Sequence, residues 1–296
     1  MKRKLSSKIK ERAIEGILLL SAISSIFITL SIVFILFYEA AGFFKDVSIW
    51  EFVTGRQWTP LFAQPKFGIL PLVCGTLLVT GIAVLVALPV GLIVAVYLSE
   101  YAPFRIKEVA KPILELLAAV PTVVYGYFAL LFLTPILRTV IPNLSGFNAL
   151  SPGIIMGIMI IPYVSSVSED SMKAVPMQIR EGSYAMGATK FQTAFKVVIP
   201  SAFSGIAAAF IIGISRAIGE TMVVAIAAGM MPNLTLNPIE PIQTLTAYIV
   251  GVSLGDVPHG TLEYKTIFAA GITLFLMTLF LNILWFWFRR RIREAY

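Results

Sequence analysis

The chain has 296 residues, of which 58% are hydrophobic and only 13% are charged. Soluble domains are about 45–50% apolar and about 25% charged, so this composition excludes an ordinary soluble domain and predicts an integral membrane protein. One cysteine, Cys74, excludes an internal disulfide, and one histidine, His259, leaves almost nothing for a histidine metal site. A net charge of +7 fits a membrane protein whose basic loops remain in the cytoplasm.

Six apolar segments predict an all-α protein with six transmembrane helices, because about 20 apolar residues cross about 30 Å of hydrocarbon. A basic segment, 1–13, precedes the first of them. That first apolar run is too long for a cleavable signal peptide, and no small-residue cleavage site follows it. The predicted spans are 14–38, 69–98, 112–137, 152–167, 201–230 and 266–288.

The positions of lysine and arginine indicate which side each connection faces. If the N-terminus is cytoplasmic, 17 of the 23 basic residues fall on cytoplasmic segments and only five on outer loops. Both termini and the connection 168–200 are therefore predicted to be cytoplasmic, and the loops 39–68 and 231–265 to lie outside. The basic tail 289–296 is predicted to hold the last helix against anionic lipid headgroups.

Two prolines, Pro89 and Pro121, fall inside predicted spans. Proline removes a backbone hydrogen bond from a helix, and neighbouring groups must then satisfy the freed carbonyl. The prolines therefore mark either packing irregularities or hinges.

The most informative connection is the segment 180–200, REGSYAMGATKFQTAFKVVIP. It opens with the charged pair Arg180–Glu181, continues through small residues, and ends at Pro200. Small side chains allow another backbone to approach closely, and Gly187 permits a sharp turn between two short helices. The segment contains no nucleophile, metal cluster or phosphate-binding loop, and it predicts a docking surface.

This segment resembles the coupling loop of permease subunits in ATP-driven uptake transporters, the ABC importers. Glu181 and Gly187 stand at the spacing of that motif, and nine further residues lead to Val197-Val198-Ile199-Pro200. Two alanines of the motif are replaced by glycine and serine, which keeps the positions small. The resemblance implies a type I (MetI-like) importer fold with a permease core at 69–290. It also implies that the following residues couple the chain to an ATPase: Arg180, Glu181, Gly182, Ser183, Gly187 and Pro200.

Further segments resemble the phosphate-specific branch of these permeases. They are GTLLVT, YLSEYAP, PTVVYG and RAIGET, and the loop GRQWTP resembles the C-type subunit (PstC) more than its A-type partner. The likeness runs from about Gly55 to the end of the chain. It implies a phosphate importer in a bacterial or archaeal cytoplasmic membrane. The implied partners are an A-type permease, two copies of an ATPase and an extracytoplasmic phosphate-binding protein.

The fifth predicted span contains the charged residues Arg216 and Glu220. A charge within hydrocarbon costs at least about 2.5–3.5 kcal/mol, so such residues usually pair or face a water-filled path. Four positions apart on a helix, the two side chains are predicted to share a face and reach each other. They form either a self-neutralising structural pair or an anion path that also includes Ser215 and Thr221.

In the second interpretation Arg216 contacts the translocated anion, because a guanidinium matches the oxygens of phosphate two at a time. The family resemblance also points to this pair. Glu220 would accept a hydrogen bond from protonated phosphate, which sulfate has no proton to donate.

No glycine-rich loop ending in Lys-Ser or Lys-Thr occurs, so the chain is not expected to hold ATP by that route. We expect no bound cofactor, no nucleic-acid partner and no bond chemistry, with ATP and Mg²⁺ used by the partner ATPase. Three alternatives remain: a permease for sulfate or molybdate, a transporter driven by an ion gradient, and a membrane scaffold that signals through its ATPase partner.

Overall fold

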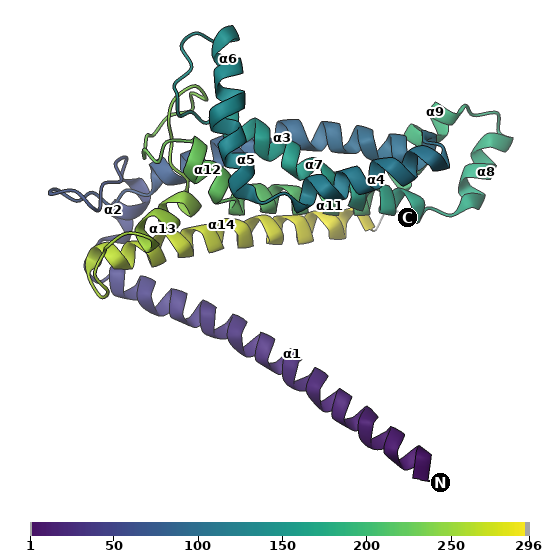
Figure 1. The fold of residues 1–296 in the computed structure, drawn as a ribbon, viewed down its shortest axis with the longest axis horizontal. Coiled ribbons are helices and arrows are strands. Elements are labelled where there is room, and N and C mark those ends of the chain that lie inside the picture. The colour runs from purple at the N-terminus through teal and green to yellow at the C-terminus, as the bar shows by residue number, and fades with distance from the viewer. Residues whose placement is uncertain (1, 294–296) are drawn as a thin grey trace.

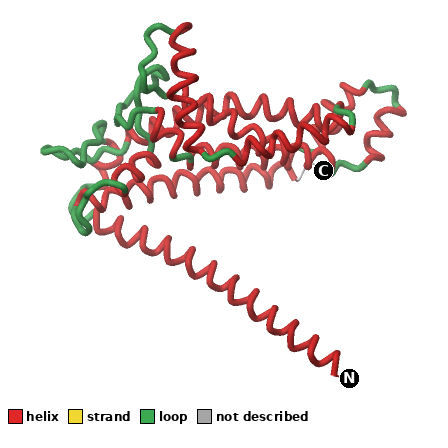
Figure 2. The backbone as a smooth tube through the Cα atoms, in the orientation of Figure 1, coloured by secondary structure: helices red, strands yellow, loops and turns green. Residues whose placement is uncertain are grey.

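The computed structural model describes residues 2–293 and, within them, the side chains of 11–287. This part of the chain consists of helices and loops (Figure 2). The α-helices are α1 (Lys2–Phe43), α2 (Ile49–Thr54), α3 (Leu70–Val96), α4 (Phe104–Ala119), α5 (Thr122–Phe128), α6 (Thr134–Val140), α7 (Leu150–Lys173), α8 (Met177–Ala185), α9 (Lys190–Thr193), α10 (Ile199–Ser201), α11 (Phe203–Gly219), α12 (Met222–Ala227), α13 (Leu245–Ser253) and α14 (Leu262–Arg293). Three π-helical turns extend them: η1 (Tyr97–Tyr101), η2 (Ala129–Leu133) and η3 (Ala194–Val198).

The centre of the molecule is a bundle in which α3, α7 and α11 run along the long axis (Figure 1). These helices share one hydrophobic core that includes Ala83, Met159 and Val164. Helices α3 and α7 approach so closely that a Cβ added at Gly157 would lie 2.6 Å from the Cβ of Val86. Small residues at the contact bring the two backbones together, as is common between membrane helices.

An aromatic cluster closes the end of the bundle near α2 and α13. Phe43, Phe52, Phe67 and Trp58 are buried there with Tyr248, and their rings meet edge to face. Edge-to-face contacts add to the burial energy of such large side chains. The segments 39–68 and 231–265, predicted as outer loops, therefore contain short helices and form a packed cap.

The predicted third span, 112–137, has a different layout. Helix α4 begins at Phe104 and ends at Ala119, and a second helical stretch runs from Thr122 to Val140. The break falls at Val120–Pro121, because proline has no N–H and forces the preceding residue out of the helical region. Pro89, in contrast, lies inside α3 without ending it.

The predicted fifth span, 201–230, is also not one helix. The stretches Lys190–Ser201 and Phe203–Gly219 meet at an angle of 73°. Helix α11 then ends at Gly219, and α12 begins only at Met222. This second break changes the expected geometry of the charged residues.

The second span, predicted at 69–98, is α3 from Leu70 to Val96, continued by η1 to Tyr101, and the three remaining spans are longer than predicted. The fourth, predicted at 152–167, is α7 from Leu150 to Lys173, and the last, predicted at 266–288, is α14 from Leu262 to Arg293. The first, predicted at 14–38, is α1 from Lys2 to Phe43. Of the predicted tail 289–296, residues 294–296 lie outside the described residues.

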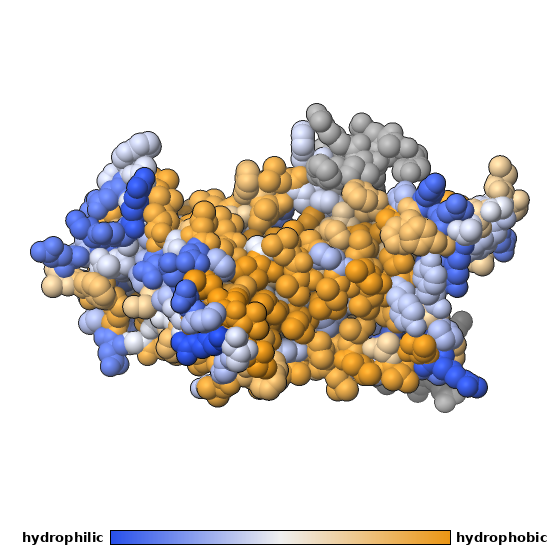
Figure 3. Space-filling view, turned by 90° about the horizontal axis from the view of Figure 1, so that it is seen from above, coloured by the Kyte–Doolittle hydropathy of each residue, from blue (hydrophilic) through white to orange (hydrophobic). Residues whose placement is uncertain are grey.

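Length and composition make this a multi-pass membrane protein. Five described helices are long and apolar enough to span a membrane, or six if the bent pair counts as one span. Figure 3 shows hydrophobic side chains across the middle of one face and hydrophilic residues at both ends of the long axis. Helix α1 meets α14 through Phe37 and Phe275, then diverges from the bundle (Figure 1), and most of its side chains from residue 11 onward are exposed.

The close contact between α3 and α7 generates a test of the fold. We expect Gly157→Ala to lower the free energy of unfolding by about 1–3 kcal/mol, because the new methyl group overpacks the contact with Val86. The matched control is Gly81→Ala on α3, where nothing lies within 4 Å of the added Cβ. Both changes carry the same helix-propensity gain. Equal denaturation midpoints of the two purified variants in detergent would contradict the packing.

Candidate functional site

Arg216 lies one turn before the end of α11 and rests on an aromatic ring from α7. Its guanidinium carbon is 4.2 Å from the centroid of the Tyr163 ring. Its Nε is buried without a hydrogen-bond partner among the described residues, and no ion pair found in that part of the chain includes it. The ring face attracts the cation, and the guanidinium has no carboxylate partner in the described chain.

The predicted contact between Arg216 and Glu220 is wrong, because α11 ends before Glu220. The Glu220 backbone is extended, with φ −67° and ψ 135°. Its Oε1 accepts hydrogen bonds from the N–H groups of Met222 at 3.1 Å and Val223 at 3.3 Å, the first two residues of α12. A carboxylate is favourable there because these N–H groups have no partner inside the helix.

Glu220 is fixed further by its own backbone carbonyl, which accepts a hydrogen bond from Thr246 Oγ1 at 2.6 Å. The residue is 8% exposed. Within the described chain its second carboxylate oxygen, Oε2, accepts no hydrogen bond. The carboxyl group is therefore held in place with one oxygen unused.

The remaining predicted path residues flank the same break. Ser215 is half-buried next to Arg216, and Thr221 Oγ1 donates to the carbonyl of Gly219 at 3.2 Å. All four predicted residues thus belong to the segment 215–221, where the backbone changes from one helix to the next. Their part in a translocation path stays a prediction.

The predicted coupling segment forms two short helices, α8 and α9, that project from one end of the bundle (Figure 1). Gly187 makes the turn between them with φ +81°, which confirms the predicted turn. Thr189 caps α9 in a reciprocal arrangement with Gln192. The hydroxyls of Ser183 and Thr193 lie 2.9 Å apart and join the two helices.

The exposed edge of this segment is centred on Met186, which is 88% exposed at the tip of the turn. Glu181, Gly182 and Gly187 are exposed on the same segment, whereas Ser183 is half-buried. The sequence analysis missed Met186, although an apolar residue beside a turn glycine was a usable signal. A large exposed apolar side chain at a projecting tip is typical of a protein contact.

Arg180 points into the chain rather than toward this edge. One of its terminal nitrogens, Nη2, donates to the backbone carbonyl of Met172 at 2.7 Å and lies 3.1 Å from Glu100 Oε1. The two charged side chains are 15% and 6% exposed. Pro200, the last predicted docking residue, is half-buried beside a cavity.

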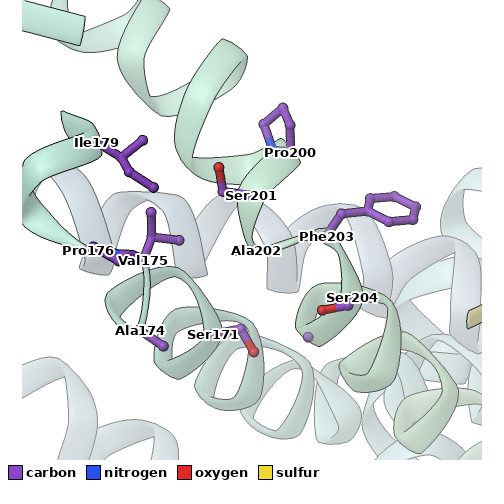
Figure 4. Close-up of a pocket in the computed structure, with 11 residues that line it drawn as sticks. Ser171, Ala174, Val175, Pro176, Ile179, Pro200, Ser201, Ala202, Phe203 and Ser204 are labelled. Carbon is purple, nitrogen blue, oxygen red and sulfur yellow. The ribbon is translucent and has the colours of Figure 1, made fainter. Parts of the chain in front are cut away.

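That cavity, of about 550 Å³, lies where α7 ends and α10 bends into α11 (Figure 4). Its lining includes Val175, Ile179, Pro200 and Phe203, with Ser171 on the α7 side. The bend at Ala202 is therefore incompletely packed on one side. Incomplete packing leaves room for the bend angle to change.

A second ionic cluster joins α4 to α7. Glu169, only 1% exposed, lies 3.0 Å from Lys111 and 2.5 Å from Lys173. The hydrogen bond to Glu169 raises the pKa of Lys111, which keeps that lysine charged. A cavity of about 420 Å³ extends from these groups to Tyr163, the ring beneath Arg216.

Metal ligands are not grouped in the described part of the chain, where no three His, Cys, Asp or Glu side chains lie close enough to hold an ion. The functional candidates are therefore the free guanidinium of Arg216, the capped carboxylate of Glu220 and the projecting pair α8–α9. This arrangement can bind an anion inside the bundle and a protein at its end.

Comparison with known proteins gives the family. The family model described as "Binding-protein-dependent transport system inner membrane component" matches residues 87–294. The chain belongs to this family. The probable ABC transporter permease protein YqgH of Bacillus subtilis is 35% identical to this permease over 92% of the chain and 88% of its own length. The probable phosphate transport system permease protein PstC of Methanocaldococcus jannaschii is 31% identical over 89% of this chain and 91% of its own length. The phosphate transport system permease protein PstC of Mesorhizobium japonicum is 31% identical over 77% of this chain and 74% of its own length.

Solved structures support the same fold. A subunit of a bacterial ABC transporter involved in alginate import aligns with 98% of the permease and 99% of its own chain, with a TM-score of 0.68 and 18% identity. A chain of the inward-facing MetNI methionine transporter aligns with 76% of the permease and 95% of its own chain, with a TM-score of 0.60 and 17% identity. The predicted MetI-like, all-α architecture and the PstC-type assignment are confirmed.

The Glu169 cluster generates a stability prediction. We expect Glu169→Gln to lower the free energy of unfolding by about 1–3 kcal/mol, because two lysines then lose their shared counter-charge while remaining partly solvated. The control is Asp170→Asn, an adjacent exposed carboxylate that makes no ion pair in the described chain. Denaturation midpoints in detergent measure both, and an equal change would contradict a specific role for Glu169.

Proposed function

We propose that this permease is the C-type transmembrane subunit of an ATP-driven phosphate importer and forms half of the translocation path. Relatives at 31% identity are named as phosphate transport system permeases, which supports phosphate as the substrate. The observation that carries the proposal is the guanidinium of Arg216, which lies within the bundle without a carboxylate partner in the described chain.

An unpaired arginine inside a membrane span is costly and needs a counter-charge. The self-neutralising pair with Glu220 would have supplied one, but Glu220 binds the start of α12 instead. A phosphate that passes Arg216 would supply the charge, and the planar fork would bind two of its oxygens. The stacking on Tyr163 holds the fork in place without neutralising it.

Glu220 supplies selectivity in this proposal. Its Oε2 is free to accept a hydrogen bond from protonated phosphate, whereas sulfate near neutral pH has no proton to donate and meets only repulsion. The carboxylate also limits how tightly Arg216 retains the anion. Ser215 would add a hydroxyl donor at the same break, and Thr221, whose proton is donated to the Gly219 carbonyl, would add a hydroxyl acceptor.

Energy enters through the end of the bundle that bears α8 and α9. One of two copies of an ATPase, which use ATP and Mg²⁺, would bind this projecting pair through Glu181, Gly182, Met186 and Gly187. An A-type permease would complete the path, and an extracytoplasmic binding protein would deliver phosphate to the opposite end. ATP and the loaded binding protein must each favour the outward state for the switch to occur.

The proposal places the permease in a cytoplasmic membrane with both termini inside. The starts of α1 and α8 and the end of α14 lie toward the same end of the molecule (Figure 1). Seventeen basic residues belong to segments assigned to that side, and lipid headgroups would contact the basic end of α14. Membership of a binding-protein-dependent family weighs against a transporter driven by an ion gradient.

Phosphate uptake tests the anion path. In proteoliposomes of the copurified complex, we expect Arg216→Ala to reduce ATP-dependent phosphate uptake at least about 30-fold, because truncating a buried charged contact costs about 2–5 kcal/mol. Arg216→Lys keeps the charge without the fork and should retain intermediate uptake.

The matched control is Arg105→Ala, which removes an exposed arginine outside the candidate spans. Assembly of each variant is checked by copurification with the ATPase. Unchanged uptake in Arg216→Ala would exclude the path at this residue. Competition by sulfate or molybdate in the wild type would leave an oxyanion importer but assign a different substrate. Lost uptake with phosphate signalling intact would separate transport from a scaffold role.

Docking of the ATPase is tested at the tip of the turn. We expect Met186→Glu to weaken copurification of the ATPase at least about fivefold, because a central apolar contact is worth more than about 1 kcal/mol. Met177→Glu is the control, since Met177 is also exposed but lies at the other end of α8. Normal ATPase recovery with Met186→Glu, or equal loss with both variants, would contradict docking at the tip.

A further inference from the structure

The inward-pointing side chain of Arg180 connects helix α8 to two membrane spans. Its Nη2 reaches two elements at once: the carbonyl of Met172 in α7 at 2.7 Å, and the carboxylate of Glu100 in η1 at 3.1 Å. Glu100 Oε1 also accepts a hydrogen bond from Ser99 at 2.8 Å, which fixes the carboxylate. Because η1 continues α3, one side chain connects α8 with two spans.

The burial of this contact separates it from an ordinary surface ion pair. Glu100 is 6% exposed and Arg180 is 15% exposed, and the Nε of Arg180 is buried. Partners in such a place are poorly screened by water, and the loss of one leaves the other as an uncompensated charge. The pair therefore holds its geometry more firmly than the exposed pair between Asp46 and Lys265, whose atoms are 3.8 Å apart.

The last turn of α7 also takes part in a second ionic cluster, which joins it to α4. Lys173, the residue after Met172, pairs with Glu169, which also binds Lys111 of α4. The elements α3, α4, α7 and α8 are thus joined around the C-terminal end of α7. The 550 Å³ cavity beside the α10–α11 bend lies next to the same turn of α7. The ionic contacts that join the four elements are therefore adjacent to the loosely packed bend.

We propose that Arg180 is a positioning residue that carries movement of α8 into α3 and α7 together, through Glu100 and the Met172 carbonyl. The inference rests on the proposed function for its assignment of α8 to ATPase coupling. A displacement of the exposed edge around Met186 then moves two spans as one body, while the poorly packed bend lets α11 rotate relative to them. In this account Arg180 does not contact the ATPase.

The test compares Arg180→Met, Glu100→Gln, the double variant and Arg180→Lys in the reconstituted complex. Each single variant should retain ATPase binding and ATP hydrolysis but consume at least about tenfold more ATP per phosphate taken up. The double variant should be no worse than either single, because the two residues act as one contact. Arg180→Lys keeps a cation with several donors and should restore the wild-type ratio to within threefold.

Gln178→Ala, an exposed substitution two residues away on α8, is the matched control and should leave the ratio unchanged. A second readout needs no substrate. Spin labels at Ile93→Cys on α3 and Gln178→Cys on α8, in a Cys74→Ala background, report the separation of the two helices. That distance should stay constant between nucleotide-free and ATP-bound complexes, and should change with ATP when Arg180→Met is added.

The outcomes distinguish this inference from the proposed function. Absence of phosphate uptake by the wild type would refute the proposed substrate, and the label distances would still decide whether Arg180 joins α8 to α3. Label distances that do not depend on Arg180 would overturn the inference. Loss of ATPase binding in Arg180→Met but not in Glu100→Gln would also overturn it, because Arg180 would then contact the ATPase directly.

Discussion

Every charge in the interior of this bundle requires a partner, and the structure is arranged around how each one is satisfied. Glu169 is held between two lysines, Glu100 binds Arg180, and Glu220 binds the first N–H groups of α12. Arg216 differs, because its contact in the described chain is an aromatic ring that attracts the cation without neutralising it. One site of unbalanced positive charge is thus left within a bundle whose buried carboxylates are all engaged in the described chain. A permease for an anion requires such a site, and the breaks in the helices are what keep Glu220 from occupying it.

Much of the fold was predictable because it depends on local chemistry. Spans follow from apolar length, and the turn at Gly187 follows from a backbone angle that glycine adopts readily. Pro121 was expected as a packing irregularity or a hinge within one span, and it ends a helix instead. The relation between Arg216 and Glu220 was not predictable in this way. Their spacing of four residues predicts a shared helical face. In the structure α11 ends at Gly219, and Glu220 lies outside that helix and caps α12. The same local sequence is compatible with a Glu220 carboxylate that caps α12 and with one that faces Arg216. Tertiary packing decides which of the two forms.

Contacts distant in sequence explain the other differences. Tyr163 lies more than fifty positions before Arg216, and Glu100 is eighty positions before Arg180. No local pattern indicated either pairing, so Arg180 was assigned to the exposed edge with its neighbours. The same limit applies to Glu169, whose partners come from α4 and from its own helix. The exposed Met186 differs from these residues, because its position directly before the turn residue Gly187 is a local signal that sequence reasoning could have used.

In the proposed transport path, the free guanidinium of Arg216 binds the transported anion opposite Glu220. The most direct measurement is a structure of the assembled complex, trapped with phosphate and a non-hydrolysable ATP analogue. We expect phosphate density within hydrogen-bond distance of the Arg216 guanidinium, with Glu220 Oε2 accepting a hydrogen bond from the protonated oxygen. A carboxylate from the A-type partner bound to Arg216, with phosphate elsewhere, would contradict the account.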